Sequence, residues 1–401
     1  MKRIRWMALL LLATSPAWPA AKKITVGELK DMLLTMHQQG KSDQDVANAL
    51  KQVQLTEELT RAMMNSLVPA VPGQLSTEQI YVLEARSAML APPATDIPTT
   101  PAPDAAGQQA LLTKAEDYVN KTYTQIPALT TTRTTLRFQD NVEALAASSG
   151  MHGSATDVSV GSGFVNPSQF VKYINASDAT IGLDRGEEKL PEDKTRWGAN
   201  GMIALMTPDP GLGQVWNEAK DAGGAKWLRW ELVNGKPAAV FAFQVPKKKT
   251  HIAVNVCCFP KIDQTGSARF SGQNGAGMPG GGQGAGGGAH GNFQTNTEYE
   301  LYKTVAPYHG EFFVDPDTGT VVRMITQAEL KSSDVVHQVD TRIDYGPATV
   351  GDKSLVLPLK TIVDTEVVPY GESGGGGYHE RVTLLTSEFK NQQLSGATAS
   401  K

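Results

Sequence analysis

The sequence predicts an α+β protein in which a small helical bundle is followed by a domain of antiparallel β-strands. Apolar residues recur at the helical period over residues 24–90, whereas short runs of alternating apolar and polar residues dominate after residue 130. A stretch rich in proline and small residues, 91–108, separates the two patterns and is expected to form an extended linker. We therefore expect the bundle to fold apart from the β domain, with few contacts between the two.

The predicted bundle spans residues 22–90 and holds three apolar stripes at helical spacing. Ser42, Thr56 and Ser76 each stand just before an expected helix, where a side-chain hydroxyl can accept a hydrogen bond from the first turn. Between Ile24 and Leu90 eight acidic residues outnumber five basic ones, the wrong balance for contact with nucleic-acid phosphates. We expect a structural or protein-docking bundle. The stripes are Leu29, Met32, Leu33 and Met36; Val46, Ala49, Leu50 and Val53; and Leu59, Met63 and Leu67.

Two turns define hairpins in the predicted β domain, 109–392. Asn234-Gly235, the strongest two-residue hairpin signal, separates two alternating runs. In the second hairpin, Pro316 presets φ at the first turn position and Gly319 can take the positive φ that closes the turn. Other expected elements are the helices Leu111–Thr122 and Gly213–Asp221, the strand Thr130–Phe138, and alternating runs at 252–258, 336–345, 354–359, 360–368 and 379–389, before a disordered tail at 393–401.

Composition and cysteine content limit the class of protein. The net charge is -4 and the isoelectric point about 6.0, so no polyanionic partner is implied. The chain contains two cysteines, Cys257 and Cys258, which are adjacent. Neighbouring residues on a strand point to opposite faces, so a disulfide between them requires a distorted peptide, and two reduced packing cysteines are the favoured interpretation.

The start of the chain has the pattern of an export signal. Basic residues precede the short apolar run Trp6–Ala13, which predicts a secretory signal peptide within residues 1–21. Cleavage is expected after Ala17, or as a second choice after Ala20 or Ala21. No cysteine lies near these positions to carry a lipid anchor, and no later segment is apolar for long enough to span a bilayer. We expect the mature chain in the periplasm or outside the cell.

No catalytic or metal-binding constellation emerges from the sequence. Ser162 lacks the spacing of a nucleophile elbow, and the seven histidines include no i, i+4 pair. The oxygens of Asp315, Asp317 and Thr318 are explained by the glycine-containing turn rather than by a cation. The glycine-rich insert 272–291 precedes an alternating pattern rather than a helix, so a surface loop is favoured over a phosphate-binding loop. We expect a protein that is not an enzyme and uses no metal or cofactor.

Several segments together resemble a known family. They are the helix 111–122 and the segments TRTTLRF, WLRW, FFVDPDTGTVVRM and IDYGPATVGDKSLVLPLK. This set is similar to uncharacterised secreted bacterial proteins whose C-terminal part resembles the LolA and LolB carriers and sorting proteins of outer-membrane lipoproteins. The segments ITVGELKDML, GKSDQDVANAL, LTEELT and PPATDIP resemble the N-terminal region of the same group. The likeness to the carriers covers about residues 110–390.

The resemblance implies a strongly curved antiparallel sheet, an unclosed half-barrel, with helices covering a concave apolar face that receives acyl chains in the carriers. No catalytic residue transfers, because the carriers have none. Alternation in this chain predicts a three-stranded meander from residue 226 to residue 259 with one apolar face. A curved sheet covered by few helices can leave space at that face. The candidate ligand-binding residues are Trp230, Phe241, Phe243, Val254 and Val256.

Two functions therefore remain open. One is an envelope protein that binds a lipid, a lipoprotein or another apolar ligand at this face. The other is a protein-interaction or regulatory module that has the same half-barrel with a filled core and uses the helical bundle as its partner surface. A face left unfilled by the chain's own side chains favours the first function, and a filled core favours the second.

Overall fold

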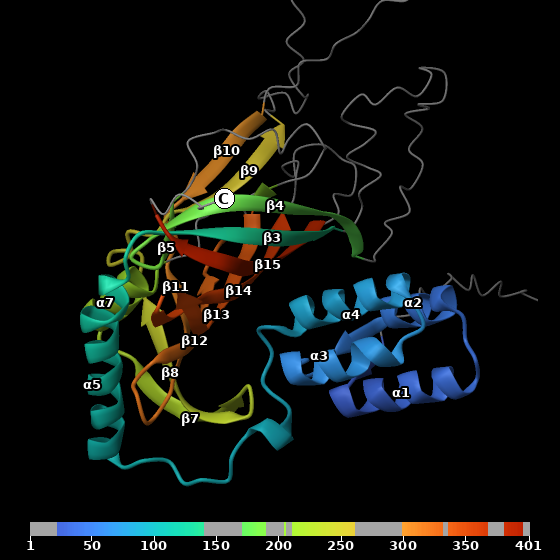
Figure 1. Cartoon of the computed structure of the whole chain (residues 1–401), viewed down its shortest axis with the longest axis horizontal. Helices are drawn as coiled ribbons and strands as arrows, with labels where there is room; N and C mark the ends of the chain where they lie inside the picture. The colour runs from blue at the N-terminus through green and yellow to red at the C-terminus, as the bar shows by residue number, and fades with distance from the viewer. Residues whose placement is uncertain are drawn as a thin grey trace, which may run out of the picture.

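The computed structural model describes residues 22–139, 171–189, 204–205, 211–260, 299–331, 336–367 and 381–395. The predicted signal peptide, Ser162 and the glycine-rich insert lie outside these ranges. The described chain has the predicted α+β fold, in which helices pack on a curved antiparallel sheet that does not close (Figure 1).

The N-terminal bundle combines four helices with two short parallel strands. Its elements are β1 (Lys22–Ile24), α1 (Val26–Gln38), α2 (Asp43–Lys51), β2 (Val53–Leu55), α3 (Arg61–Leu67), the 3-10 turn η1 (Val68–Ala70) and α4 (Gln74–Ser87). Ser42 caps α2 as predicted, because its side chain accepts the N–H of Asp45 while the Asp45 carboxylate accepts the N–H of Ser42. Leu29, Leu33, Val46, Leu50, Met64, Leu67, Ile80 and Leu83 are among the buried residues of the bundle core.

Two helix starts in the bundle differ from the prediction. The third helix begins after Thr60 rather than Thr56, since the Thr60 side chain accepts the N–H of Met63. The fourth begins after Gly73, and Ser76 lies inside it. The Asp43 carboxylate supplies the missing cap from the neighbouring helix: it accepts the Ser76 N–H at 2.9 Å. A cap provided by another element leaves no local signal in the sequence. Val53, expected on a helical stripe, belongs to β2.

The linker is shorter than predicted. It contains the 3-10 turn η2 (Ala94–Asp96), and the next helix, α5 (Ala105–Lys121), already begins after Asp104, whose carboxylate accepts the Gly107 N–H at 2.7 Å. The turn η3 (Tyr123–Gln125) follows α5, and α7 (Leu212–Asp221) matches the second predicted helix of the β domain. Their apolar stripes are buried as expected: Leu111, Ala115, Tyr118 and Val119 on α5, and Val215, Trp216 and Ala219 on α7.

The main sheet has the strand order β5-β4-β3-β15-β14-β13-β12-β11-β8-β7 with antiparallel neighbours throughout. A separate small sheet has the order β10-β9-β6. The strands are β3 (Leu129–Gln139), β4 (Lys172–Asp184), β5 (Glu187–Lys189), β6 (Ala204–Leu205), β7 (Lys226–Val233), β8 (Lys236–Val245), β9 (Val254–Pro260), β10 (Tyr299–Thr304), β11 (Tyr308–Val314), β12 (Val321–Ala328), β13 (Val336–Val350), β14 (Lys353–Val367) and β15 (Arg381–Leu394).

Both predicted hairpins are confirmed. Asn234 and Gly235 have φ values of 51° and 78° between β7 and β8, as a type I′ turn requires. The turn from β11 to β12 closes at Gly319, with φ 76°. The Asp315 carboxylate stabilises the turn from within, because its Oδ1 accepts hydrogen bonds from the N–H groups of Asp317 and Thr318, each at 2.9 Å. The turn therefore forms with the chemistry expected from its sequence.

Three details of strand assignment were wrong. The meander does not form, because β8 pairs with β11 on its second edge, while β9 pairs with β10 and β6 in the small sheet. The runs 354–359 and 360–368 are parts of one strand, β14. The last strand continues to Leu394, two residues into the predicted tail. Alternation defines a strand, but the choice between β9 and β11 as a partner depends on packing far along the chain.

Both faces of the main sheet are covered by helices, one by α5 and α7 and the other by the bundle (Figure 1). The face covered by α5 and α7 contains Phe312, and the opposite face contains Phe313, as alternation along β11 requires. The bundle covers the second face, where Val82 and Ala85 of α4 share a buried cluster with Ile362 and Leu384 of the sheet. The expectation of few contacts between bundle and β domain is therefore wrong for the described residues.

Candidate functional site

The predicted ligand-binding residues are split between different parts of the fold. Phe241 and Phe243 lie on β8 in the core cluster under α5 and α7, and Trp230 of β7 packs against the edge of this cluster. Val254 instead belongs to a small cluster with Val336 and Val339. The side chain of Val256 lies outside the described part of β9. The predicted face is thus not continuous over the three strands, because β9 is not a neighbour of β8.

Aromatic side chains of the protein itself fill the face between α7 and β8. The Phe243 and Phe312 rings stack with their centroids 4.3 Å apart, and the Trp216 ring of α7 lies 4.8 Å from Phe312. Phe241, directly opposite Phe312 in the strand register, is 0% exposed and meets the edge of Trp227 at 5.6 Å. Rings packed at these distances occupy the place where a bound acyl chain was predicted.

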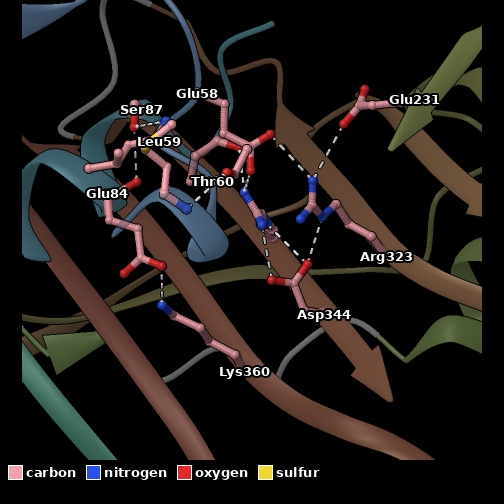
Figure 2. A network of polar contacts seen from close by, with 12 residues as sticks. Glu58, Leu59, Thr60, Glu84, Ser87, Glu231, Arg323, Asp344 and Lys360 are labelled. Atoms are coloured by element: carbon pink, nitrogen blue, oxygen red, sulfur yellow. Dashed lines mark hydrogen bonds and ion pairs between the residues drawn. The ribbon is translucent and has the colours of Figure 1, made fainter. Parts of the chain in front are cut away.

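A buried network of ion pairs joins the bundle to the opposite face of the sheet (Figure 2). Glu58, in the loop before α3, lies between two guanidiniums: its Oε1 accepts from Arg342 Nη1 at 2.5 Å, and its Oε2 lies 3.4 Å from Arg323 Nη1. Asp344 accepts from the same two arginines, from Arg323 Nε at 2.7 Å and from Arg342 Nη2 at 3.0 Å. Glu231 Oε1 of β7 lies 3.6 Å from Arg323 Nη1. Each charge thus has at least one partner of opposite sign.

The network extends along β7 to the strand edge. Arg229 donates two hydrogen bonds to the Glu311 carboxylate, at 3.1 Å and 3.0 Å, and two to Glu231 Oε2, at 2.9 Å and 2.6 Å. The Arg323 guanidinium lies 5.2 Å from the centre of the Phe313 ring, a cation–π distance. The bidentate contact between Arg229 and Glu311 fixes geometry as well as charge, and it joins β7 to β11 within the sheet.

Burial and ion pairing act in opposite directions on the pKa values of the network. Burial alone would raise the pKa of the Asp344 carboxyl, but the guanidiniums of Arg323 and Arg342 hold that pKa well below its ordinary range. Burial raises the pKa of Glu231, although Arg229 and Arg323 oppose the shift. The Asp344 carboxyl is therefore the more firmly ionised of the two.

A second buried pair fixes α4 to the sheet. Lys360 Nζ of β14 donates to Glu84 Oε1 at 2.5 Å, and the side chains are 2% and 5% exposed. Close by, Ser87 Oγ accepts the Leu59 N–H at 3.0 Å and thereby ties the loop before α3 to α4. Sequence reasoning missed these charged contacts, because a charged residue alternating with apolar ones on a strand is expected to face water.

A cavity of about 640 Å³ lies where the bundle, the linker and the β7–β8 turn meet. Its volume falls within the range of about 300–1,000 Å³ that is typical of ligand clefts. Apolar and charged side chains share its walls. The lining residues are Thr25, Val26, Gly27, Glu57, Thr60, Arg61, Ala62, Met63, Ser66, Pro93, Ala94, Thr95, Asp96, Leu232, Asn234, Gly235 and Arg323.

Metal-binding groups and membrane-spanning helices are two other features to consider in the described residues. In these ranges, no group of three or more His, Cys, Asp or Glu side chains is arranged to hold a metal ion. None of the helices in the described ranges is both long and apolar enough to cross a membrane. The thiols of Cys257 and Cys258 lie outside the described side chains.

Comparison with known proteins identifies no relative from which function can be carried over. No protein-family model matches the chain, and no curated protein matches it. Among solved structures, the chain is similar to "The complex structure of Pseudomonas aeruginosa MucA/MucB", with 10% sequence identity over 71% of this chain and 94% of that chain. The TM-score of this superposition is 0.20, which bears on neither fold nor function. The fold class established for this chain is therefore that of its own structure: an α+β protein with an open antiparallel sheet.

Proposed function

We propose that the chain is an exported, non-enzymatic envelope protein that acts by binding another protein, with its helical bundle and linker as the partner surface. The observation that carries this choice is the aromatic packing beneath α7. Phe243 stacks on Phe312 at 4.3 Å and Trp216 closes over Phe312 at 4.8 Å, so the side chains of the protein fill the face expected to receive an acyl chain. A filled face favours an interaction module over a lipid carrier.

The bundle is also held in a defined position relative to the sheet. Glu58 and Glu84 place two carboxylates of the bundle against arginines and a lysine of the sheet, at distances down to 2.5 Å. A partner surface composed of bundle, linker and β7–β8 turn is thereby presented in a fixed geometry, which reduces the entropy lost on binding. From the resemblance to lipoprotein carriers we keep only the half-barrel fold and not the binding of acyl chains.

The test compares partner cross-linking with lipid content. A photo-reactive amino acid placed at Leu34 or Ile97, which are 44% and 42% exposed on the bundle and the linker, is expected to give one discrete cross-link to an envelope protein in cells. The same group at Leu394, 45% exposed on β15, serves as the matched control and is expected to give none. Organic extracts of the purified chain are expected to contain no stoichiometric lipid by mass spectrometry.

A lipid carrier predicts different results. Saturable displacement of a fluorescent fatty acid, lost in Phe243→Glu and in Trp230→Glu while circular dichroism is retained, would overturn the interaction proposal. Trp230 is only partly buried and gives a second variant if Phe243→Glu does not fold.

A further inference from the structure

The cavity at the junction of bundle, linker and β7–β8 turn has walls of two chemical kinds. Its apolar lining includes Val26 of α1, Met63 of α3 and Leu232 of β7, with the linker residues Pro93 and Ala94 also in the wall. These side chains can exclude water from an apolar group that enters the cavity. The cavity therefore has room for a side chain and an apolar lining to receive one.

The charged groups of the cavity are not balanced. Both of its arginines are already paired: Arg61 Nη2 lies 3.3 Å from Glu388 Oε1, and Arg323 Nε donates to Asp344 at 2.7 Å. Among the described residues, the carboxylates of Glu57 and Asp96 take part in no ion pair. Glu57 Oε1 accepts a hydrogen bond from the Val26 N–H at 2.8 Å. Because this partner is a neutral backbone group, the charge of Glu57 is not compensated by a cationic side chain in the part of the chain that the structure describes. The cavity thus has two carboxylates available to a cation.

The environment of Asp96 agrees with this imbalance. Burial raises the pKa of its carboxyl, a hydroxyl hydrogen bond from Thr95 partly opposes the shift, and the nearby Glu58 and Glu57 raise the pKa further. A cation entering the cavity would relieve this repulsion. Anionic lipid headgroups would instead be repelled by the same carboxylates, which disfavours a membrane surface as the occupant.

We propose that this cavity docks a segment of a partner polypeptide that presents a lysine or arginine beside an apolar side chain. The inference rests on the proposed interaction function and names its site. The apolar side chain lies against Val26, Met63 and Leu232, and the cation lies between Glu57 and Asp96. A polypeptide carries both groups on neighbouring residues, so one segment can supply the cation and the apolar side chain together. Because bundle, linker and sheet each supply part of the wall, the segment binds only when the bundle is docked.

The experiment selects peptides on the full exported chain. A random dodecapeptide library displayed on phage is enriched on the immobilised protein, and enriched peptides are synthesised with fluorescein for anisotropy measurements. We expect enrichment of a basic residue next to an apolar one. Ala62 is exposed on α3 and lines the cavity, so Ala62→Trp is expected to fill it and weaken binding about tenfold or more. Ala110→Trp, at an exposed position of α5, is the matched control and is expected to leave binding unchanged.

A second variant tests the cation without changing shape. In Glu57→Gln with Asp96→Asn, the amide oxygens can still accept the hydrogen bonds from Val26 and Thr95, but both charges are lost. We expect weaker peptide binding and a flatter dependence on salt concentration than in the wild-type chain. Unchanged circular dichroism and thermal unfolding midpoints show that the variants remain folded.

The outcomes separate this inference from the proposed function. Peptides that lack basic residues, or that bind Ala62→Trp as tightly as wild type, overturn the cavity as the docking site, while a discrete cross-link from Leu34 or Ile97 still supports an interaction module. An absence of both enriched peptides and cross-links overturns the two together.

Discussion

Arg342 and Glu58, which are 284 residues apart in the sequence, meet in a hydrogen bond of 2.5 Å at the boundary between sheet and bundle. Both side chains are almost fully buried, at 4% and 3% exposed. Two buried charges at this distance stabilise the fold only as a pair, because either one left alone loses its hydration without compensation. This boundary is therefore the place where substitution should couple most strongly to the stability of the whole chain.

Removing the Glu58 carboxylate should break the ion pairs that join the bundle to the sheet. Glu58→Ala leaves Arg342 and Arg323 facing each other with Asp344 as their remaining shared partner, and is expected to lower the free energy of unfolding by about 3–5 kcal/mol. Urea unfolding followed by tryptophan fluorescence measures the loss. The control is Glu329→Ala, which removes a carboxylate 3.3 Å from His309 on the surface and should cost less than about 1 kcal/mol. Equal losses in the two variants would contradict the role of the network.

The Lys360–Glu84 pair allows a double-mutant test. Lys360→Met leaves Glu84 buried without its cation and is expected to cost about 3–5 kcal/mol, whereas adding Glu84→Leu should recover most of that loss. The recovery follows because two apolar side chains need no mutual compensation. Chemical unfolding of both single variants and the double variant gives the coupling free energy. Additive losses in the double variant would show that the two charges do not act as a pair.

The filled aromatic face predicts a large cost for truncation. Phe243→Ala removes a ring that is 5% exposed and stacked on Phe312, and should lower the free energy of unfolding by about 3–5 kcal/mol. Leu228→Ala on the neighbouring strand, at 45% exposed, is the control and should change it by no more than about 0.5 kcal/mol. A small loss in Phe243→Ala would indicate a face with spare volume, as a ligand carrier requires.

Asp340 predicts a specific pH dependence. Burial raises the pKa of its carboxyl to about 6, although hydrogen bonds from Gln327 and Gln338 at 2.9 Å act in the opposite direction. A carboxyl whose folded-state pKa lies above its unfolded value destabilises the fold at neutral pH, and this penalty is relieved as the pH falls from about 6 toward 4. Asp340→Asn should therefore be more stable than wild type near pH 7, by at most about 3 kcal/mol.

The difference between Asp340→Asn and wild type should shrink between about pH 7 and pH 4, as measured by urea unfolding at each pH. Asp31→Asn, the same substitution at an exposed position of α1, controls for the loss of one charge. A difference that stays constant over this range would show that Asp340 does not titrate there.

Local patterns in the sequence determined the elements of this fold. The helical stripes containing Leu111 and Val215, the Ser42 cap, and the turns at Asn234-Gly235 and Gly319 all depend on residues close together in the chain, so a single sequence reveals them. The α+β class and the antiparallel sheet follow from the same signals.

Only the tertiary structure decided which elements meet. Pairing of β8 with β11 rather than β9 split the predicted ligand face, and docking of the bundle buried Glu58 and Lys360 at positions whose sequence pattern indicates exposure. The physical reason is that alternation and capping report on neighbours along the chain, whereas burial of a charge depends on a partner hundreds of residues away. The cavity of about 640 Å³ also depends on tertiary structure, because its walls come from the bundle, the linker, the β7–β8 turn and Arg323 of β12, which are separate parts of the sequence.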